Sequence, residues 1–273
     1  MIIRMISGAG YLLVTAGFFL LREFVDVRLF NILIWFFGEL GTFEVARAVK
    51  KRIGKPAFVI SVISGVLFVP LFSIVEWFFT GFGFVAVLAL CLLTFIVLAF
   101  VVQKDCLFYH AVVCVYPSLP LLTMLVINYM PKHISFIALA LIFIITPMAD
   151  TFAYCVGRLI GGKKLCPKLS PKKTWAGAVG GTIGGIVASL IVFYAFGQAL
   201  AEQIRWCVVL FVIIGIVTSI LTIFGDLFAS YIKRRVGIKD YGKIMPGHGG
   251  IMDRIDGTCF ASMFIMIAFL LIG

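Results

Sequence analysis

Three aspartates near the carboxyl end of the chain have a type and spacing that suit a divalent cation. Asp253 and Asp256 lie three positions apart in the stretch PGHGGIMDRIDG, residues 246–257, and Asp226 lies upstream in FGDLFASYIKRR. Residues three apart share one helical face, so the first two carboxylates can point at one site if a helical turn begins after Gly250. Carboxylates without thiolate neighbours suit a hard ion such as Mg²⁺. The pattern predicts that Asp226, Asp253 and Asp256 bind one or two Mg²⁺ ions, and it leaves a second, different cation open.

Basic and hydroxyl side chains accompany these acids. Ser230 and Lys233 follow Asp226 at i+4 and i+7, which places all three on one helical face. The glycines at 247–250 would let backbone N–H groups approach a ligand closely. Asp226 itself could instead be neutralised by Lys233 or by a lysine from another loop. The side chains expected to contact a substrate anion are Ser230, Lys233, Arg234, His248 and Arg254.

A second basic cluster, SPKKTW at residues 170–175, joins hydroxyl and ammonium groups at the expected start of a helix. Free N–H groups and the helix dipole favour an anion there, and two lysines reinforce this. We therefore predict that Lys172, Lys173 and Thr174 contact a phosphate group. The lysines between 163 and 168 are better explained as a basic cytoplasmic loop.

A divalent ion surrounded by lysines and arginines indicates a substrate with several negative charges. Phosphoryl or nucleotidyl transfer depends on positioning the reacting groups and on neutralising phosphate oxygens, which these residue types can do. The sequence therefore predicts an enzyme of this class, with catalytic roles for Asp226, Lys233, Asp253 and Asp256.

The chain that must position these residues is strongly apolar. Of its 273 residues, 63% are hydrophobic and 13% are charged, whereas soluble domains have roughly 25% charged residues. We therefore expect an all-α integral membrane protein, a polytopic bundle of about nine transmembrane helices. The expected spans are residues 5–21, 29–48, 57–79, 82–102, 107–130, 134–157, 175–198, 207–232 and 258–272.

The positive charges predict the orientation of these helices. With the N-terminus in the cytoplasm, all but four of the 23 lysines and arginines fall on the cytoplasmic side, the exceptions being Arg22, Arg28, Lys132 and Arg205. This bias agrees with the positive-inside rule and places both late polar loops on the cytoplasmic face. Anionic lipid headgroups also favour such a face, so the net charge of +11 requires no nucleic-acid partner.

No repeat or polar linker divides the chain, so we expect a single membrane domain over residues 1–273. It would consist of mainly apolar helices at 1–145, a polar catalytic region with two cytoplasmic loops at 146–257, and a last helix at 258–273. The seven scattered cysteines contain no CxxC pair, which argues against a disulfide framework and a thiolate zinc site.

Residue spacing predicts two helical faces within the polar region. Asp150, Tyr154 and Arg158 line one face if their helix continues past Pro147. A seam of small residues typical of close helix packing follows, and it leaves a helix-mediated homodimer open. The seam consists of glycines 177, 180, 181, 184 and 185.

Three acids lie inside apolar runs, namely Glu39, Glu44 and Glu76. An acid inside a membrane span is by default a functional candidate. No basic partner is evident, and the last two lie near the ends of their runs, so we favour paired or interfacial structural roles. We also interpret His110 and His133 as structural.

The stretch from Ser230 to Asp256 resembles the signature of the phosphatidate cytidylyltransferases, also called CDP-diacylglycerol synthases. The resemblance rests on SYIKR at 230–234, KD at 239–240 and PGHGGIMDRID at 246–256, with their spacings. GDLF at 225–228 and the earlier stretch that ends in SPKKTW resemble the other polar blocks of the family. The similarity at the level of motifs covers residues 150–257.

This resemblance implies a membrane enzyme that joins CTP to phosphatidic acid and releases pyrophosphate, giving CDP-diacylglycerol with the help of Mg²⁺. It implies metal binding by Asp226, Asp253 and Asp256, phosphate contacts by Lys233, Arg234 and Arg254, and substrate contacts by Ser230 and His248. Lys172, Lys173 and Thr174 would contact the nucleotide phosphates or the lipid headgroup. In a bacterium the enzyme would lie in the inner membrane, among its lipids, with the active site facing the cytoplasm.

The chain departs from the family pattern at three positions. Ala176 and Ala229 stand where glutamate is common, and Gly257 stands where serine commonly ends the signature. The loss of two carboxylates bears on the number of metal ions and on the rate more than on the reaction class.

Two other functions use the same ingredients. A CTP-dependent lipid kinase of the polyprenol or phytol type would transfer a γ-phosphate to an alcohol. A transporter of anions or lipids would use the same basic cavity, but the sequence shows no inverted repeat of the kind that transporters commonly have.

Overall fold

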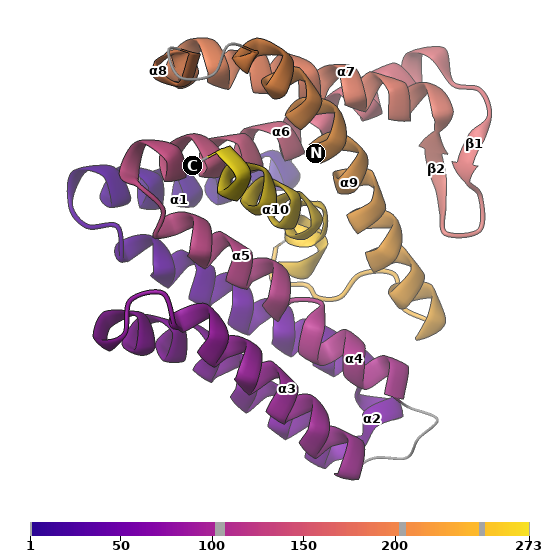
Figure 1. Ribbon diagram of the computed structural model, residues 1–273. Helices are drawn as coiled ribbons and strands as arrows, with labels where there is room; N and C mark the ends of the chain where they lie inside the picture. Colours follow the sequence, from indigo (N-terminus) through magenta and orange to yellow (C-terminus); the bar gives the residue numbers. More distant parts are fainter. Residues whose placement is uncertain (1, 102–106, 202–205, 246–248, 273) are drawn as a thin grey trace. The chain divides into compact units, whose positions relative to one another are not determined.

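The computed structural model describes residues 2–101, 107–201, 206–245 and 249–272, and nearly all of them are helical (Figure 1). In chain order the elements are α1 (Ile2–Phe24), α2 (Leu29–Phe78), α3 (Gly83–Val101), α4 (Leu107–Val115), α5 (Ser118–Asn128), α6 (Lys132–Ile160), β1 (Lys164–Cys166), β2 (Ser170–Thr174), α7 (Trp175–Val192), a π-helical turn (Phe193–Gly197), α8 (Gln198–Ala201), α9 (Cys207–Arg235) and α10 (Met252–Ile272). The prediction of an all-α polytopic membrane protein is confirmed.

Seven helical segments in the described part of the chain are long and apolar enough to cross a membrane. They are Leu29–Phe78, Gly83–Phe100, Phe108–Asn128, Lys132–Ile160, Trp175–Gly197, Cys207–Arg235 and Met252–Leu271. The prediction of about nine spans is therefore corrected to seven. Two of the expected spans, 29–48 and 57–79, fall in the single helix α2, and the span expected at 5–21 lies in α1, which is not among the seven.

The helix α2 is 50 residues long and contains one break. Gly54 has φ 82° and ψ 171°, which is outside the helical region and which glycine adopts readily. Pro56 follows two residues later, and a proline inside a helix removes a backbone hydrogen bond. The two expected spans therefore correspond to the two helical stretches of α2 that meet at this kink.

The helices form two compact units. The first comprises Met1–Val126 and Arg235–Ile255, and the second comprises Ile127–Arg234 and Asp256–Gly273. In the first unit the apolar core is built on α2, where Phe30, Phe37 and Val45 are buried. In the second unit α6 and α7 lie side by side, and α6 buries Leu139 and Ile142. The single membrane domain expected from the sequence stays a prediction.

Glycines on α7 let neighbouring helices of the second unit approach closely. A Cβ added at Gly181 would lie 3.1 Å from the carbonyl oxygen of Ala149 on α6. One added at Gly185 would lie 2.7 Å from the carbonyl oxygen of Gly215 on α9. The glycine seam is thus confirmed as a surface of close helix packing. Helices of the same chain cover it, so a homodimer would need another surface.

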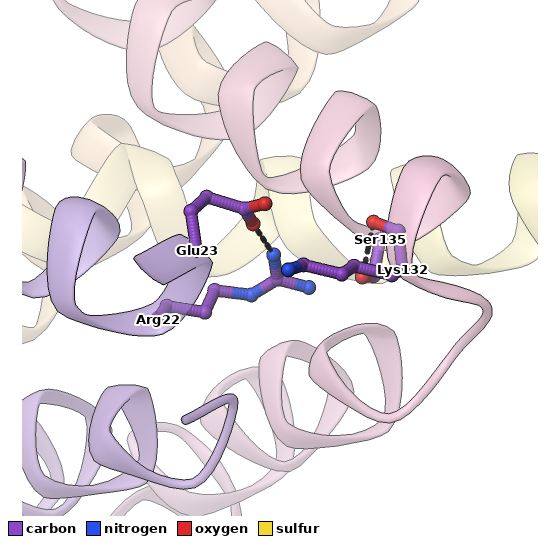
Figure 2. A network of polar contacts seen from close by, with 4 residues as sticks. All are labelled: Arg22, Glu23, Lys132 and Ser135. Atoms are coloured by element: carbon purple, nitrogen blue, oxygen red, sulfur yellow. Dashed lines mark hydrogen bonds and ion pairs between the residues drawn. The ribbon is translucent and has the colours of Figure 1, made fainter. Parts of the chain in front are cut away.

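Polar residues near helix ends have partners within a few residues of themselves. Figure 2 shows the buried guanidinium of Arg22, which donates from Nη1 to Glu23 Oε1 at the end of α1. In the second unit the Ser135 hydroxyl donates to the carbonyl oxygen of Lys132 at 3.1 Å, in the first turn of α6. The cysteines in the described part of the chain are free.

Candidate active site

The helix α9 places three predicted site residues on one face. The Ser230 hydroxyl lies 3.5 Å from Asp226 Oδ1 and donates to it across one turn. Lys233 follows on the next turn and is buried, with 8% of its surface exposed. The i, i+4, i+7 spacing therefore places Asp226, Ser230 and Lys233 on one face of α9, as expected.

Asp226 is paired with a base from the β-hairpin of the same unit. Lys173 Nζ lies 2.6 Å from Asp226 Oδ2, and the two side chains are 24% and 35% exposed. Of the two kinds of partner considered from the sequence, a lysine from another loop is the one found here. Partly exposed ion pairs contribute little to stability, so an incoming ion or anion can open this pair at small cost.

Glycines bring α9 and α10 into backbone contact in the second unit. A Cβ added at Gly225 would lie 3.0 Å from the Cα of Gly257, and one added at Gly257 would lie 2.7 Å from Thr222 Cγ2. Backbones come this close only where side chains are absent. Asp226 follows the first glycine and Asp256 precedes the second, so the contact holds the two acids on adjoining helices.

Asp256 is a buried acid with other charges close to it. It is 8% exposed, and its Oδ1 accepts a hydrogen bond from the Gly257 N–H at 2.7 Å. Asp226 and Asp150 repel its negative charge, and Lys233 attracts it. Burial strengthens such interactions because little water screens them. This balance suits the binding of a cation.

Asp226 and Asp256 supply oxygen ligands of the chemical type that Mg²⁺ takes. Mg²⁺ is usually held by one or two protein carboxylates, while water and substrate phosphates fill its other positions. Within the described ranges, no group of three or more His, Cys, Asp or Glu side chains could hold an ion by itself. An ion in the second unit would therefore take most of its ligands from a phosphate compound and from water.

The cluster at 170–175 forms a strand and a helix start. Ser170–Thr174 is β2, which pairs antiparallel with β1 and so satisfies its backbone hydrogen bonds. The sequence did not predict this hairpin: it indicated a loop for the lysines at 163–168 and a helix start at residues 170–175. The helix α7 begins at Trp175, and Thr174 Oγ1 accepts a hydrogen bond from the Gly177 N–H at 3.0 Å. The hydroxyl oxygen of Thr174 thus caps α7.

Removing this cap should lower the stability of the protein. Thr174 is buried, and its replacement by alanine leaves the Gly177 N–H without its acceptor. We expect Thr174→Ala to lower the free energy of unfolding by about 1 kcal/mol, and Thr174→Ser to retain most of it. Thermal unfolding of the detergent-solubilised variants measures the difference. Equal stabilities of the two variants would contradict the capping role.

Asp253 lies in the first unit, where it holds the part of the signature from Tyr241 to Gly250, called here the signature segment. Asp253 Oδ2 accepts hydrogen bonds from the N–H groups of Tyr241 at 2.8 Å and Gly250 at 3.0 Å. Met245 and Gly249 exchange backbone hydrogen bonds, and Gly249 has φ 92°, a value that favours glycine. Asp253 therefore closes the loop before α10, and its role as a metal ligand stays a prediction.

The other predicted contact residues are exposed bases and one histidine. Lys172, Arg234 and Arg254 are exposed, as bases that meet a dissolved nucleotide would be. His248 lies outside the described residues. The last helix begins at Met252 rather than at 258, so Asp253 and Asp256 both lie near its start, three positions apart.

The helix α6 continues past Pro147, as the polar face on it requires. It ends at Ile160, and Arg158 Nη1 donates to the Tyr154 hydroxyl at 3.1 Å across one turn. The predicted face is therefore helical, and Asp150 lies on it two turns before Arg158.

A comparison with protein families matches residues 2–272 to the model described as the cytidylyltransferase family. The chain belongs to this family. Membership of the cytidylyltransferase family agrees with the resemblance found in the signature segment, and it extends the match to the N-terminal half, which the motifs did not reach.

Curated relatives in the cytidylyltransferase family carry the name phosphatidate cytidylyltransferase. The protein of Brucella abortus (strain 9-941) is 36% identical over 132 residues, which cover 48% of this chain and 46% of the relative. That of Rickettsia conorii is 35% identical over 127 residues, or 46% and 55% of the two chains. That of Haemophilus influenzae is 36% identical over 134 residues, or 49% and 46%. The chain thus spans about half the length of the curated relatives it matches.

Close packing accounts for two of the three departures from the cytidylyltransferase pattern. Ala229 on α9 is fully buried, so a glutamate there would need room that the second unit does not show. Gly257 lies where a Cβ would meet Thr222 Cγ2, so a serine would require that methyl group to move. Nothing in the structure explains Ala176.

The acids inside α2 have contacts in the first unit. Glu76 Oε1 accepts a hydrogen bond from the Gly81 N–H at 2.8 Å, and Glu44 Oε2 accepts one from the Met252 N–H at 2.9 Å. Both acids therefore have hydrogen-bond donors, and their structural interpretation stays a prediction. For Glu39, Oε2 is buried without a hydrogen-bond partner among the described residues. Sequence reasoning missed that Glu44 reaches the signature segment, because 208 positions separate the two and no local pattern joins them.

Proposed function

We propose that the chain transfers the cytidylyl group of CTP to phosphatidic acid, giving CDP-diacylglycerol and pyrophosphate. The observation that carries the proposal is that two acids, Asp226 on α9 and Asp256 on α10, lie on adjoining helices. Two bases accompany them, the buried Lys233 and the hairpin residue Lys173. Carboxylates for a metal and ammonium groups for phosphate, side by side in a membrane protein, suit a nucleotide and a lipid phosphate as substrates.

Mg²⁺ would be held by Asp226 and Asp256, with Asp253 as the further ligand that the signature implies. When bound, the ion neutralises phosphate oxygens and aligns the attacking and leaving groups. The repulsion between Asp226 and Asp256 supports this assignment, because a cation placed beside both would relieve it.

The bases would neutralise the phosphate groups of the substrates. Lys233 is buried next to the acids, so its charge acts at short range and with little screening. Lys173 would exchange Asp226 for a phosphate oxygen when the substrate enters. Lys172, Arg234 and Arg254 are exposed and would attract the triphosphate or the lipid headgroup. Ser230 and His248 would contact the substrate or orient the acids.

In the reaction, an oxygen of the lipid phosphate forms a bond to the α-phosphorus of CTP. The bond between that phosphorus and the bridging oxygen to the β-phosphate breaks, and pyrophosphate leaves with the electron pair. A phosphate monoester is already largely dianionic near pH 7, so the attacking oxygen needs no general base. The residues of the chain therefore act by placing and neutralising charge.

The distribution of lysines and arginines supports an active site at the cytoplasmic face of a membrane, the inner membrane in a bacterium. The substrates suit this location, because CTP is dissolved in the cytoplasm and phosphatidic acid lies in the bilayer. Membrane lipids would surround the apolar helices.

Labelled substrate tests the proposal directly. Purified protein, phosphatidic acid, Mg²⁺ and CTP labelled with ³²P at the α-position should give labelled lipid. Label left wholly in CDP when an alcohol lipid is supplied would indicate a lipid kinase and contradict the proposal. Flux of anions or lipids across liposomes that is insensitive to Asp253→Asn, with no labelled lipid, would indicate a transporter.

A further inference from the structure

A carboxylate from the N-terminal half of the chain holds the start of α10 in the first unit. Glu44 on α2 is 0% exposed, and its Oε2 accepts a hydrogen bond from the Met252 N–H at 2.9 Å. The other oxygen of this carboxylate, Oε1, is buried without a hydrogen-bond partner among the described residues. Met252 is the first residue of α10, and the first N–H groups of a helix have no acceptor within the helix. Glu44 therefore satisfies a donor that the helix itself cannot satisfy.

Two glycines of the signature segment leave space for this carboxylate. A methyl group at either Gly242 or Gly250 would overlap the carboxyl group of Glu44. Neither glycine has a positive φ, so neither is required there by backbone conformation. Close approach to Glu44 is therefore the reason for glycine at both positions.

A second contact from α2 holds the other end of the segment. Arg47, one helical turn after Glu44, donates from Nη2 to the carbonyl oxygen of Tyr241 at 3.0 Å. The Tyr241 N–H in turn donates to Asp253 Oδ2. Neighbouring side chains on one helix thus hold both ends of the stretch from Tyr241 to Met252.

A buried acid in an apolar helix needs a reason to be there. A carboxylate at such a position costs several kcal/mol unless it is paired, and a serine or an aspartate within the loop could cap α10 more cheaply. A cap from another helix does what a local cap cannot, because it fixes the start of α10 relative to α2.

We propose that Glu44 is a positioning residue for the cytidylyl transfer proposed above. It sets the place of the first turn of α10 and of the loop before it, and so the direction of the Asp253 carboxylate. It does not contact substrate. This inference rests on the proposed function for its kinetic consequence, but the contact of Glu44 with the segment can be tested independently of activity.

The test compares Glu44→Gln with Glu76→Gln, a matched control on the same helix. Glu76 also bonds backbone N–H groups, at Gly81 (2.8 Å) and Gly83 (3.1 Å), but these lie at the start of α3. Each variant would be assayed for kcat, for the KM of CTP, for the Mg²⁺ concentration at half-maximal rate, and for hydrogen–deuterium exchange of residues 241–256.

Glutamine keeps one acceptor oxygen for the Met252 N–H but loses the charge. We expect Glu44→Gln to lower kcat or the apparent Mg²⁺ affinity by about 10- to 100-fold, as is usual for residues that orient metal ligands. Exchange at 241–256 should rise in this variant alone. Glu44→Asp, which keeps the charge on a shorter side chain, should recover part of kcat. Glu76→Gln should leave kcat, KM and the Mg²⁺ requirement unchanged.

Different results would overturn the two proposals. If Glu44→Gln lowers thermal stability as Glu76→Gln does but keeps kcat and the Mg²⁺ requirement, Glu44 is a structural anchor and the inference is wrong. If the wild type makes no labelled lipid, the proposed function fails, while exchange at 241–256 still decides whether Glu44 holds the segment. Should Glu44→Gln not fold, Gly242→Ala perturbs the same contact from the other side, and unchanged kinetics in that variant would refute the inference.

Discussion

Replacing Asp256 by asparagine should lower turnover by at least about 100-fold while the protein still folds. Asparagine keeps the shape of the side chain and an oxygen that accepts the Gly257 N–H. It removes one of the carboxylates proposed to hold the ion. The repulsion from Asp226 and Asp150 and the attraction of Lys233 disappear together, so the thermal stability should change little. Loss of rate without loss of stability is the signature of a residue that acts on the reaction.

The measurement combines initial rates of lipid labelling with thermal unfolding of the same preparation. Asp26→Asn is the matched control, because the Asp26 side chain is exposed and its Oδ1 accepts a local hydrogen bond from the Arg28 N–H at 2.7 Å. It should keep wild-type turnover. Near-normal turnover in Asp256→Asn would remove Asp256 from the metal site and leave Asp226 without a partner acid in the second unit.

Helical periodicity predicted the parts of the site that lie on one element. The face of Asp226, Ser230 and Lys233 follows from spacing alone, and α9 has the expected course. The continuation of α6 past Pro147 was also predictable, because the polar face beyond it has helical spacing. Local patterns succeed here because each depends on a single helix and on no partner.

Contacts between segments far apart in the chain could not be predicted from the sequence. The bond from the Met252 N–H to Glu44 joins residues 208 positions apart, and neither has a neighbour that marks it. For Asp226 the sequence offered two kinds of basic partner, and it did not indicate that Lys173 would form the ion pair. The β-hairpin was missed because its lysines and prolines are typical of a loop, and pairing of backbone groups leaves no side-chain pattern in so short a strand.

The contact between α9 and α10 makes Gly225 the position where a small change should have a large effect. A Cβ at this residue would lie 3.1 Å from the backbone carbon of Asp256 and 3.0 Å from the Cα of Gly257, and backbone atoms cannot turn aside as a flexible side chain can. Overpacking of this kind costs about 1–3 kcal/mol and is relieved when the helices move apart. A displacement of about 1 Å at reacting groups can cost roughly 100-fold in rate.

We therefore expect Gly225→Val to lower turnover by about 100-fold or more, and Gly225→Ala to lower it by less, in the order of the added volume. Gly17→Val is the control, because a Cβ at Gly17 on α1 meets no atom within 4 Å, and it should keep wild-type turnover. Rates and thermal unfolding are measured together, and the alanine variant remains informative if the valine variant does not fold. Wild-type turnover in a folded Gly225→Val protein would show that the spacing of the two helices does not place the acids. Asp226 follows directly on Gly225. A loss of turnover that grows with the added volume would therefore show that the backbone contact positions the Asp226 carboxylate for the reaction.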